Sequence, residues 1–267
     1  MELTMLGTGN ANVTEYFNTC FLLEEAGQYF LVDTGGGNGI LKALKNAGVS
    51  VMDIHDIFIT HEHLDHLLGL LWIIRTAGHE MSQGNYPGEL RIYCHSGLVS
   101  TIRTIVELTI WKKTARYLDE RILLIPVESG ETREIAGCRV TFFDTGSTKA
   151  RQFGFILETQ NHIRLSCCGD EPARECEFPY IKDSHWLLHE AFCLYRDADK
   201  YHPREIHHST VREACTLAER FRIPNLVLYH TEEDTLADRK TLYTEEGKRF
   251  YHGNLYVPWD GEKIRIV

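Results

Sequence analysis

The chain has 267 residues, of which 43% are hydrophobic, and a formal net charge of -10 at pH 7. A chain of this length can bury one large core, and its hydrophobic fraction is ordinary for a globular protein. The negative charge argues against a broadly basic nucleic-acid-binding surface, although it allows a local basic patch. No apolar run approaches the length of a transmembrane helix, and no signal segment is visible at the N-terminus. We therefore expect a cytoplasmic protein with no membrane partner.

The first half of the chain alternates short apolar runs with helical patterns. A Gly-Thr-Gly-Asn turn at residues 7–10 follows the first run, and Gly35-Gly36-Gly37 leads into the first helix. The dinucleotide-binding fingerprint is absent, so this glycine triplet does not indicate a nucleotide cofactor. We expect strands at residues 3–6, 18–24, 28–33, 54–60 and 90–93, and helices at residues 40–47, 64–76 and 98–118.

The second half is richer in strands. We expect a helix at residues 211–221 and strands at residues 121–127, 132–135, 139–144, 154–158, 163–168 and 226–229. A hairpin is expected between residues 255–257 and 263–267, across Asp260-Gly261. Two sets of strands, each followed by helices, predict an α/β fold in four layers, an αββα sandwich of two mixed sheets. No repeat or linker is visible, so residues 1–267 are expected to form one domain.

The eight cysteines do not show the spacing of a disulfide framework. Cys167 and Cys168 are adjacent, and Cys20, Cys94 and Cys138 are scattered through apolar stretches. This pattern favours buried, reduced thiols in a reducing compartment.

The strongest motif is His61-Glu62-His63-Leu64-Asp65-His66, which directly follows an apolar run. Imidazole nitrogens and carboxylate oxygens are the usual ligands of Zn²⁺ and related ions. In an extended segment alternate residues point the same way, so His61 and His63 can share one ion. Asp65 and His66 would lie in the first turn of the following helix and face a second ion. The alternative is a charged helix start, but such a start does not need three histidines.

This His-x-His-x-Asp-His motif after a buried strand resembles the signature of the metallo-β-lactamase fold, a superfamily of mostly dinuclear metal hydrolases. The resemblance implies that Asp170, in Cys168-Gly169-Asp170-Glu171, bridges the two ions and that His230 is the last ligand. It also favours a role for Asp33 in hydrogen-bonding a ligand histidine. Without the resemblance, Asp170 and Asp33 are turn residues, and His230 is a histidine at a strand end.

Two further motifs resemble the ribonuclease Z group within this superfamily. His189-Glu190-Ala191-Phe192 is similar to its His-Glu-Ala-Thr motif, and His208-Ser209-Thr210 matches its His-Ser-Thr motif. The resemblance implies that Glu190 orients His208, which acts as general acid. The alternative is a Glu–His pair that stabilises the start of a helix.

The sequence departs from ribonuclease Z in two places. Residues 142–148 contain no histidine where the group has a further ligand, and the vacant position is assigned to Gly146. The first site would then bind its ion weakly, unless Asp144 or a substrate atom completes it. The glycine-rich basic arm of the group is also missing between Asp170 and His208. Residues 111–113 and 149–151 could still supply local positive charge, although such clusters are usually solvated surface.

We therefore expect a metal-dependent hydrolase, a phosphodiesterase or ribonuclease Z-like enzyme that uses a metal-bound hydroxide. Asp65 would accept the proton of the hydroxide or hold it in line. Two Zn²⁺ ions are expected, with Mn²⁺ or Fe as alternatives. The substrate would be a small phosphodiester or a nucleic acid, and the resemblance implies a possible homodimer. Two alternatives stay open: a carboxyl-ester, lactone or thioester hydrolase, and a non-enzymatic metal-binding protein with a degenerate site.

Overall fold

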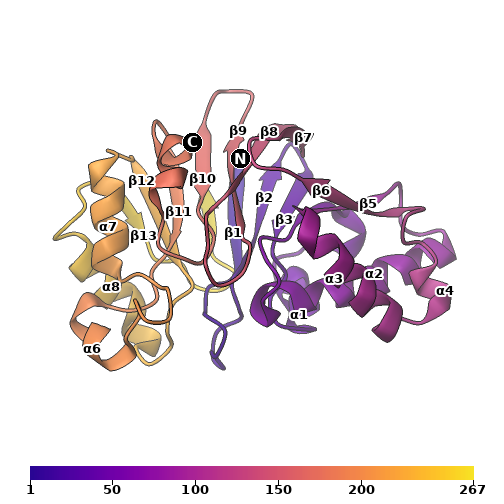
Figure 1. The fold of residues 1–267 in the computed structure, drawn as a ribbon, viewed down its shortest axis with the longest axis horizontal. Coiled ribbons are helices and arrows are strands. Elements are labelled where there is room, and N and C mark those ends of the chain that lie inside the picture. Colours follow the sequence, from indigo (N-terminus) through magenta and orange to yellow (C-terminus); the bar gives the residue numbers. More distant parts are fainter.

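The computed structural model describes all residues 1–267, and its strands form two seven-stranded sheets (Figure 1). The first sheet has the order β14-β1-β2-β3-β4-β5-β6 and the second has the order β13-β12-β11-β10-β9-β8-β7. Both sheets are mixed, because antiparallel pairs at one end give way to parallel pairs at the other.

The strands of the first sheet are β1 (Glu2–Gly7), β2 (Cys20–Glu25), β3 (Gln28–Val32), β4 (Ile54–Phe58), β5 (Leu90–His95), β6 (Ile122–Val127) and β14 (Lys263–Arg265). Those of the second are β7 (Thr132–Ile135), β8 (Cys138–Asp144), β9 (Phe153–Glu158), β10 (Arg164–Cys167), β11 (Trp186–Glu190), β12 (Asn225–Tyr229) and β13 (Asn254–Tyr256).

Helices cover the outer face of each sheet, so the four-layer αββα prediction is confirmed (Figure 1). Beside the first sheet lie α1 (Gly39–Asn46), α2 (Leu64–Gln83), α3 (Ser96–Thr109) and α4 (Lys112–Ala115). Beside the second lie α5 (Phe178–Ile181), α6 (Ala198–Tyr201), α7 (Val211–Arg220) and α8 (Arg239–Gly247). Single 3-10 turns occur at Val51–Asp53, Glu175–Glu177, Tyr195–Asp197 and Leu236–Asp238. None of the helices is both long and apolar enough to cross a membrane.

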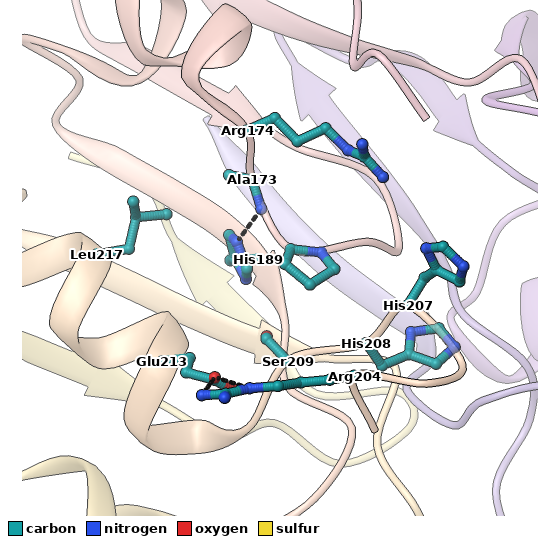
Figure 2. Close-up of a pocket in the computed structure, with 10 residues that line it drawn as sticks. Ala173, Arg174, His189, Arg204, His207, His208, Ser209, Glu213 and Leu217 are labelled. Atoms are coloured by element: carbon teal, nitrogen blue, oxygen red, sulfur yellow. Dashed lines mark hydrogen bonds and ion pairs between the residues drawn. The ribbon is translucent and has the colours of Figure 1, made fainter. Parts of the chain in front are cut away.

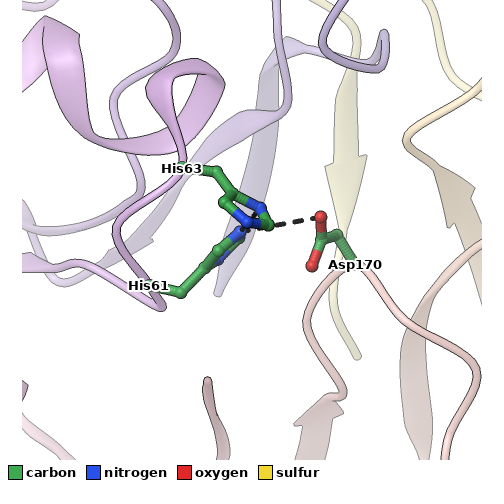
Figure 3. Close-up of side chains that lie close together, drawn as sticks. All are labelled: His61, His63 and Asp170. Carbon is green, nitrogen blue, oxygen red and sulfur yellow. Dashed lines mark hydrogen bonds and ion pairs between the residues drawn. The ribbon is translucent and has the colours of Figure 1, made fainter. Parts of the chain in front are cut away.

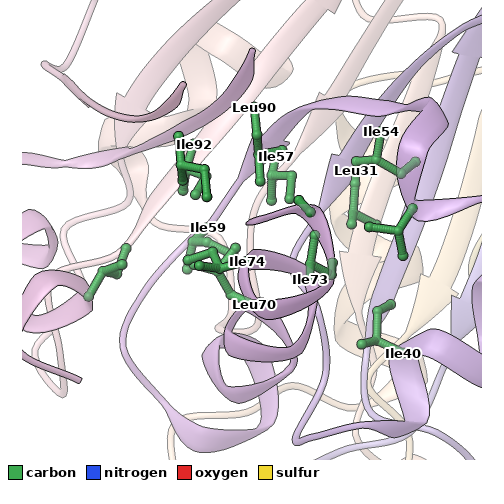
Figure 4. Close-up of a cluster of buried hydrophobic side chains, with 14 of the residues drawn as sticks. Leu31, Ile40, Ile54, Ile57, Ile59, Leu70, Ile73, Ile74, Leu90 and Ile92 are labelled. Atoms are coloured by element: carbon green, nitrogen blue, oxygen red, sulfur yellow. The ribbon is translucent and has the colours of Figure 1, made fainter. Parts of the chain in front are cut away.

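The strand β3 illustrates how the sequence builds two cores at once. Phe30 and Val32 belong to the cluster between the two sheets, whereas Leu31 belongs to the cluster beneath the helices. Successive side chains of a strand point to opposite faces, so a continuous apolar run is required wherever both faces are covered. Figure 4 shows Leu31 and Ile57 from the strands facing the helix side chains of the same cluster, such as Ile73 of α2.

The predicted hairpin between residues 255–257 and 263–267 is wrong. β13 pairs with β12 in the second sheet, whereas β14 pairs with β1 in the first. The turn at Asp260-Gly261 does form, and its contacts explain the difference. The Gly261 N–H donates to the Met5 carbonyl (2.6 Å), and the Asp260 carboxylate accepts from the Thr8 hydroxyl (2.7 Å). These contacts fasten the turn to β1, so it passes the chain from one sheet to the other.

Two helix boundaries also differ from the predictions. α2 continues to Gln83 instead of residue 76 and ends at Gly84, which has a left-handed backbone with φ of 79°. Gly78 does not end α2. It allows α2 and α4 to pack closely, because a Cβ at this position would clash with Thr114 of α4. The single helix expected at residues 98–118 is broken at Ile110, whose backbone is extended. All eight cysteines are unpaired, and all but Cys176 are buried, as expected for seven of them.

We predict that Leu31→Ala lowers the free energy of unfolding by about 2–5 kcal/mol, because it leaves a cavity between β3 and the helices. The side chain of Leu31 is fully buried, whereas that of Leu108 is 79% exposed. Leu108→Ala is therefore the matched control, with an expected change within about 0.5 kcal/mol. Urea denaturation checks both values, and equal losses for the two variants would contradict the packing described.

Candidate metal centre

The predicted ligands meet where strand ends of the two sheets come together. The first sheet and α2 supply His61, His63, Asp65 and His66, and the second sheet supplies Asp170 after β10 and His230 after β12. Their ligand atoms form two groups that could each hold a metal ion: His61, His63 and Asp170, and then Asp65, His66 and His230. Figure 3 shows the first group, with the two imidazoles facing Asp170. The structure thus brings together all six residues that the sequence singled out as ligands.

Asp170 lies between the two groups. Its Oδ2 atom is 3.7 Å from Nε2 of His61, 3.5 Å from Nε2 of His66 and 3.7 Å from Nε2 of His230. The Asp170 side chain is 4% exposed, so water screens its charge little. Burial alone would raise the pKa of Asp170, but His61 and His66 outweigh it and hold that pKa well below its usual value. One oxygen of an ionised carboxylate therefore faces three imidazole nitrogens.

Hydrogen bonds behind the imidazoles fix which nitrogen faces the centre. Nδ1 of His66 lies 2.7 Å from Oδ2 of Asp33, which can only accept, so Nδ1 is the protonated donor. Nδ1 of His61 lies 2.9 Å from the Thr60 hydroxyl, whose own proton goes to Asp33 (2.8 Å). The predicted contact between Asp33 and a histidine of the motif is confirmed for His66.

His230 follows the same scheme. Its Nδ1 is 3.2 Å from the Thr19 hydroxyl, which donates to the Gly9 carbonyl at 3.0 Å. In His61, His66 and His230 the Nδ1 proton is therefore held from behind, and Nε2 is the atom that points inward. Such anchoring of the far nitrogen is typical of histidines that bind metal ions.

The buried groups fit a divalent cation. Nε2 of His66 is buried and has no hydrogen-bond partner, although Oδ2 of Asp65 lies 3.3 Å away. Burial alone would lower the pKa of His66, but Asp33 and Asp65 raise it well above its usual value. Buried carboxylates require compensating charge, and these His and Asp donors are those that Zn²⁺ and related ions take.

The predicted Glu190–His208 pair is present but not hydrogen-bonded. Nδ1 of His208 is 3.8 Å from Oε2 of Glu190, beyond hydrogen-bond distance. The Glu190 carboxylate instead accepts from the backbone N–H groups of Ser209 (2.5 Å) and Phe192 (3.2 Å). Burial, followed by the charge of Asp170, raises the pKa of Glu190 well above its usual value, against the effect of these donors.

The ring of His208 is held by stacking. It lies 5.2 Å from the ring of Phe192 with an angle of 10° between the planes, and 5.1 Å from the ring of His230. Phe192 stands where the ribonuclease Z motif has Thr, and here it supplies the surface against which His208 rests. Burial lowers the pKa of His208 to about 3, with a further contribution from His230. His208 is therefore uncharged at neutral pH.

The structure does not support Gly146 as the vacant ligand position. The atoms nearest to a Cβ at Gly146 would be Sγ of Cys176 (3.2 Å) and Cδ of Arg174 (3.7 Å), and no imidazole atom is among them. Asp144 is not part of either group of close ligand atoms, and its carboxylate contacts Arg151 (3.4 Å). The side chain that reaches the centre is Gln152, which contacts Nδ1 of His61 (3.2 Å) and Oδ1 of Asp170. Sequence reasoning missed it, and its only signal is an uncharged polar residue directly before an apolar strand.

A pocket of about 400 Å³ opens beside His208 (Figure 2). Figure 2 shows His189, Arg174, His207 and Arg204 among the residues that line it. His189 is fully engaged, because Nδ1 contacts the Glu190 carbonyl (2.7 Å) and Nε2 accepts from the Ala173 N–H (3.2 Å). Burial lowers its pKa to about 4, so it presents an uncharged ring to the pocket.

Three basic side chains lie around this pocket, and one of them has no carboxylate partner. Arg174 and Arg204 are paired with carboxylates of Glu171 and Glu213. Lys149 is exposed, and its ammonium donates to the Ile206 carbonyl (3.0 Å) without a carboxylate partner. The predicted local positive charge at residues 149–151 thus lies beside the loop that carries His208.

Comparisons with known proteins identify the fold. Ribonuclease Z of Thermococcus sibiricus is 26% identical, with 100% of this chain and 96% of the relative covered. The structure of YhfI from Bacillus subtilis, a metallo-β-lactamase fold protein, matches with a TM-score of 0.80, 16% identity and 98% of each chain covered. The short form of human tRNase Z matches with a TM-score of 0.75, 22% identity and 100% of each chain covered. The fold is therefore the metallo-β-lactamase fold, as the sequence predicts.

The family itself is shown by a match to a family model. Residues 1–250 match the model described as anti-Pycsar protein Apyc1. This span includes both candidate metal-binding groups, Glu190 and His208. The protein therefore belongs to the anti-Pycsar protein Apyc1 family.

Proposed function

We propose that this protein is a metal-dependent hydrolase that cleaves small phosphodiesters. The observation that carries the proposal is the set of inward-facing imidazole nitrogens around Asp170, with the ring of His208 5.1 Å from that of His230. His61, His63 and Asp170 would hold one ion, and Asp65, His66 and His230 would hold the other, with Asp170 shared. Zn²⁺ is the ion we propose, with Mn²⁺ or Fe as alternatives for these donors.

Two divalent ions, when bound, would supply a water activated near neutral pH and would neutralise charge on phosphoryl oxygens. Asp65 is suited to orient that water. Burial opposes its ionisation, but His66 lowers the pKa of Asp65 well below its usual value, so the group accepts hydrogen bonds at every physiological pH. Its side chain is 10% exposed, which lets it reach the solvent side of the centre.

His208 is positioned to protonate the leaving oxygen. The uncharged ring must first gain a proton, and the negative charge of a bound phosphodiester favours the imidazolium form. Glu190, 3.8 Å away, would stabilise the same form after a small shift of either side chain. The leaving group would then lie in the pocket beside His208, which has the volume of a small-molecule site.

Phosphodiester cleavage is favoured over carboxyl chemistry by the surroundings of His208. Lys149 offers an ammonium without a carboxylate partner, which suits an anionic substrate. The relatives named ribonuclease Z also support phosphodiester cleavage. A small substrate is favoured over transfer RNA because the pocket is small and the chain carries a net charge of -10. Hydrolysis of a lactone or thioester is the alternative that the assay below separates.

We predict that Asp33→Asn weakens metal binding about 10- to 100-fold, because it removes the charge and one of the two acceptor oxygens that serve His66 and Thr60. Competition with a chromophoric chelator measures the affinity for Zn²⁺, and circular dichroism verifies that the variant is folded. Asp183→Asn, which changes an exposed carboxylate, is the matched control. An unchanged affinity in Asp33→Asn would remove the support for the anchored-imidazole scheme.

We predict that the effect of His208→Ala depends on the leaving group. For diesters with an alkyl or nucleoside leaving group, loss of the proton donor lowers kcat/KM about 10²- to 10⁴-fold. For bis-p-nitrophenyl phosphate the loss is only a few-fold, because nitrophenolate departs without a proton. His162→Ala, which removes a histidine that is 86% exposed, is the control.

The steady-state assay uses the metal-loaded protein and includes a panel of lactones and thioesters. Equal losses for good and poor leaving groups in His208→Ala would refute the general-acid role. A wild-type kcat/KM that is higher for a lactone or thioester than for every diester would refute phosphodiester specificity and favour the carboxyl alternative.

A further inference from the structure

Gln152 is a buried polar residue at the centre that the scheme above does not use. It directly precedes β9, and the residue is 2% exposed. Its Nε2 contacts Oδ1 of Asp170, and its Oε1 is buried with no hydrogen-bond partner. Burial of a polar side chain costs free energy unless the side chain forms a hydrogen bond, so the contact with Asp170 offsets part of the cost of burying Gln152.

The backbone around Gln152 is fixed on both sides. The Gln152 carbonyl accepts from the N–H (3.0 Å) and the hydroxyl (3.1 Å) of Thr145. The next N–H, that of Phe153, donates to the carbonyl of Thr60 (3.0 Å). Thr60 also anchors His61, so the base of the Gln152 side chain and the first imidazole are held by the same residue.

Gly169 provides the room for this side chain. A Cβ at Gly169 would overlap Oε1 of Gln152, and Gly169 has a left-handed backbone with φ of 78°. The glycine before Asp170 therefore serves two needs at once, the turn after β10 and the space for the amide.

The hydrogen-bonding capacities of Asp170 and His61 determine which contact the Gln152 amide makes. An ionised carboxylate only accepts hydrogen bonds, so the amide atom that faces Oδ1 of Asp170 must be the nitrogen. Nδ1 of His61 already gives its proton to Thr60 and has no lone pair left for this nitrogen. The hydrogen bond that Gln152 makes at the centre is therefore the one to Asp170.

We propose that Gln152 is a positioning residue that fixes the rotation of the Asp170 carboxylate. Its amide occupies Oδ1, which leaves Oδ2 to face His61, His66 and His230. Gln152 thus compensates for the histidine missing from residues 142–148 by acting on the shared carboxylate instead of binding an ion. The inference rests on the proposed metal centre.

The test compares Gln152→Leu and Gln152→Met with the wild-type protein by isothermal titration with Zn²⁺, with bound metal counted by elemental analysis. Both variants remove the donor, and Met keeps the length of the side chain. Because Asp170 is shared, we expect the affinities of both ions to fall together, about 10- to 100-fold. Gln83→Leu, at an exposed glutamine, should leave both affinities unchanged.

Other outcomes separate the alternatives. Loss of only one ion in the variants would show that Gln152 acts as a ligand of that ion and would overturn the proposal. Unchanged affinities would overturn it too, because Gln152 would then only fill space. The absorption spectrum of bound Co²⁺ gives a second readout, and we expect a change in its intensity in both variants. If the wild-type protein bound no ion, the metal centre itself would fail, which is a different result from any change confined to the variants.

Discussion

The carboxylate of Asp33 connects the fold to the candidate metal centre. It lies directly after β3 in a left-handed backbone conformation with φ of 55°. Its oxygens accept from the Thr60 N–H (2.8 Å), from the Thr60 hydroxyl (2.8 Å) and from His66 (2.7 Å). One buried group therefore joins the ends of β3 and β4 to the start of α2, and the same bonds orient His61 and His66. The hydrogen bonds that hold these strand ends together also direct the imidazoles inward.

The second sheet contributes the remaining two candidate ligands. Asp170 and His230 come from the ends of β10 and β12, and they face the first-sheet histidines across the junction of the sheets. The packing of Phe30, Phe58 and Phe155 in the core between the sheets sets how these two sets of residues meet. His208 lies on a loop of the second sheet and lines the pocket, whereas five of the six candidate ligands are buried and His63 is partly exposed.

The parts of the site that the sequence predicts are those with a local physical cause. His61 to His66 follow a buried strand, so their spacing alone indicates two facing groups, and the apolar runs indicate the layers. The predicted hairpin is wrong because the two strands that flank a turn can join different sheets, which the local sequence pattern does not encode. Gln152 escaped notice for a similar reason, since its partner Asp170 is brought near by the pairing of β9 with β10.

The central claim is that Asp170 is shared by two metal ions. A crystal structure of the protein grown with excess Zn²⁺, with anomalous difference maps collected on both sides of the zinc absorption edge, tests it most directly. The account predicts two zinc peaks, one among His61, His63 and Asp170 and one among Asp65, His66 and His230, with Asp170 between them. A single peak, or zinc bound only away from Asp170, would contradict it.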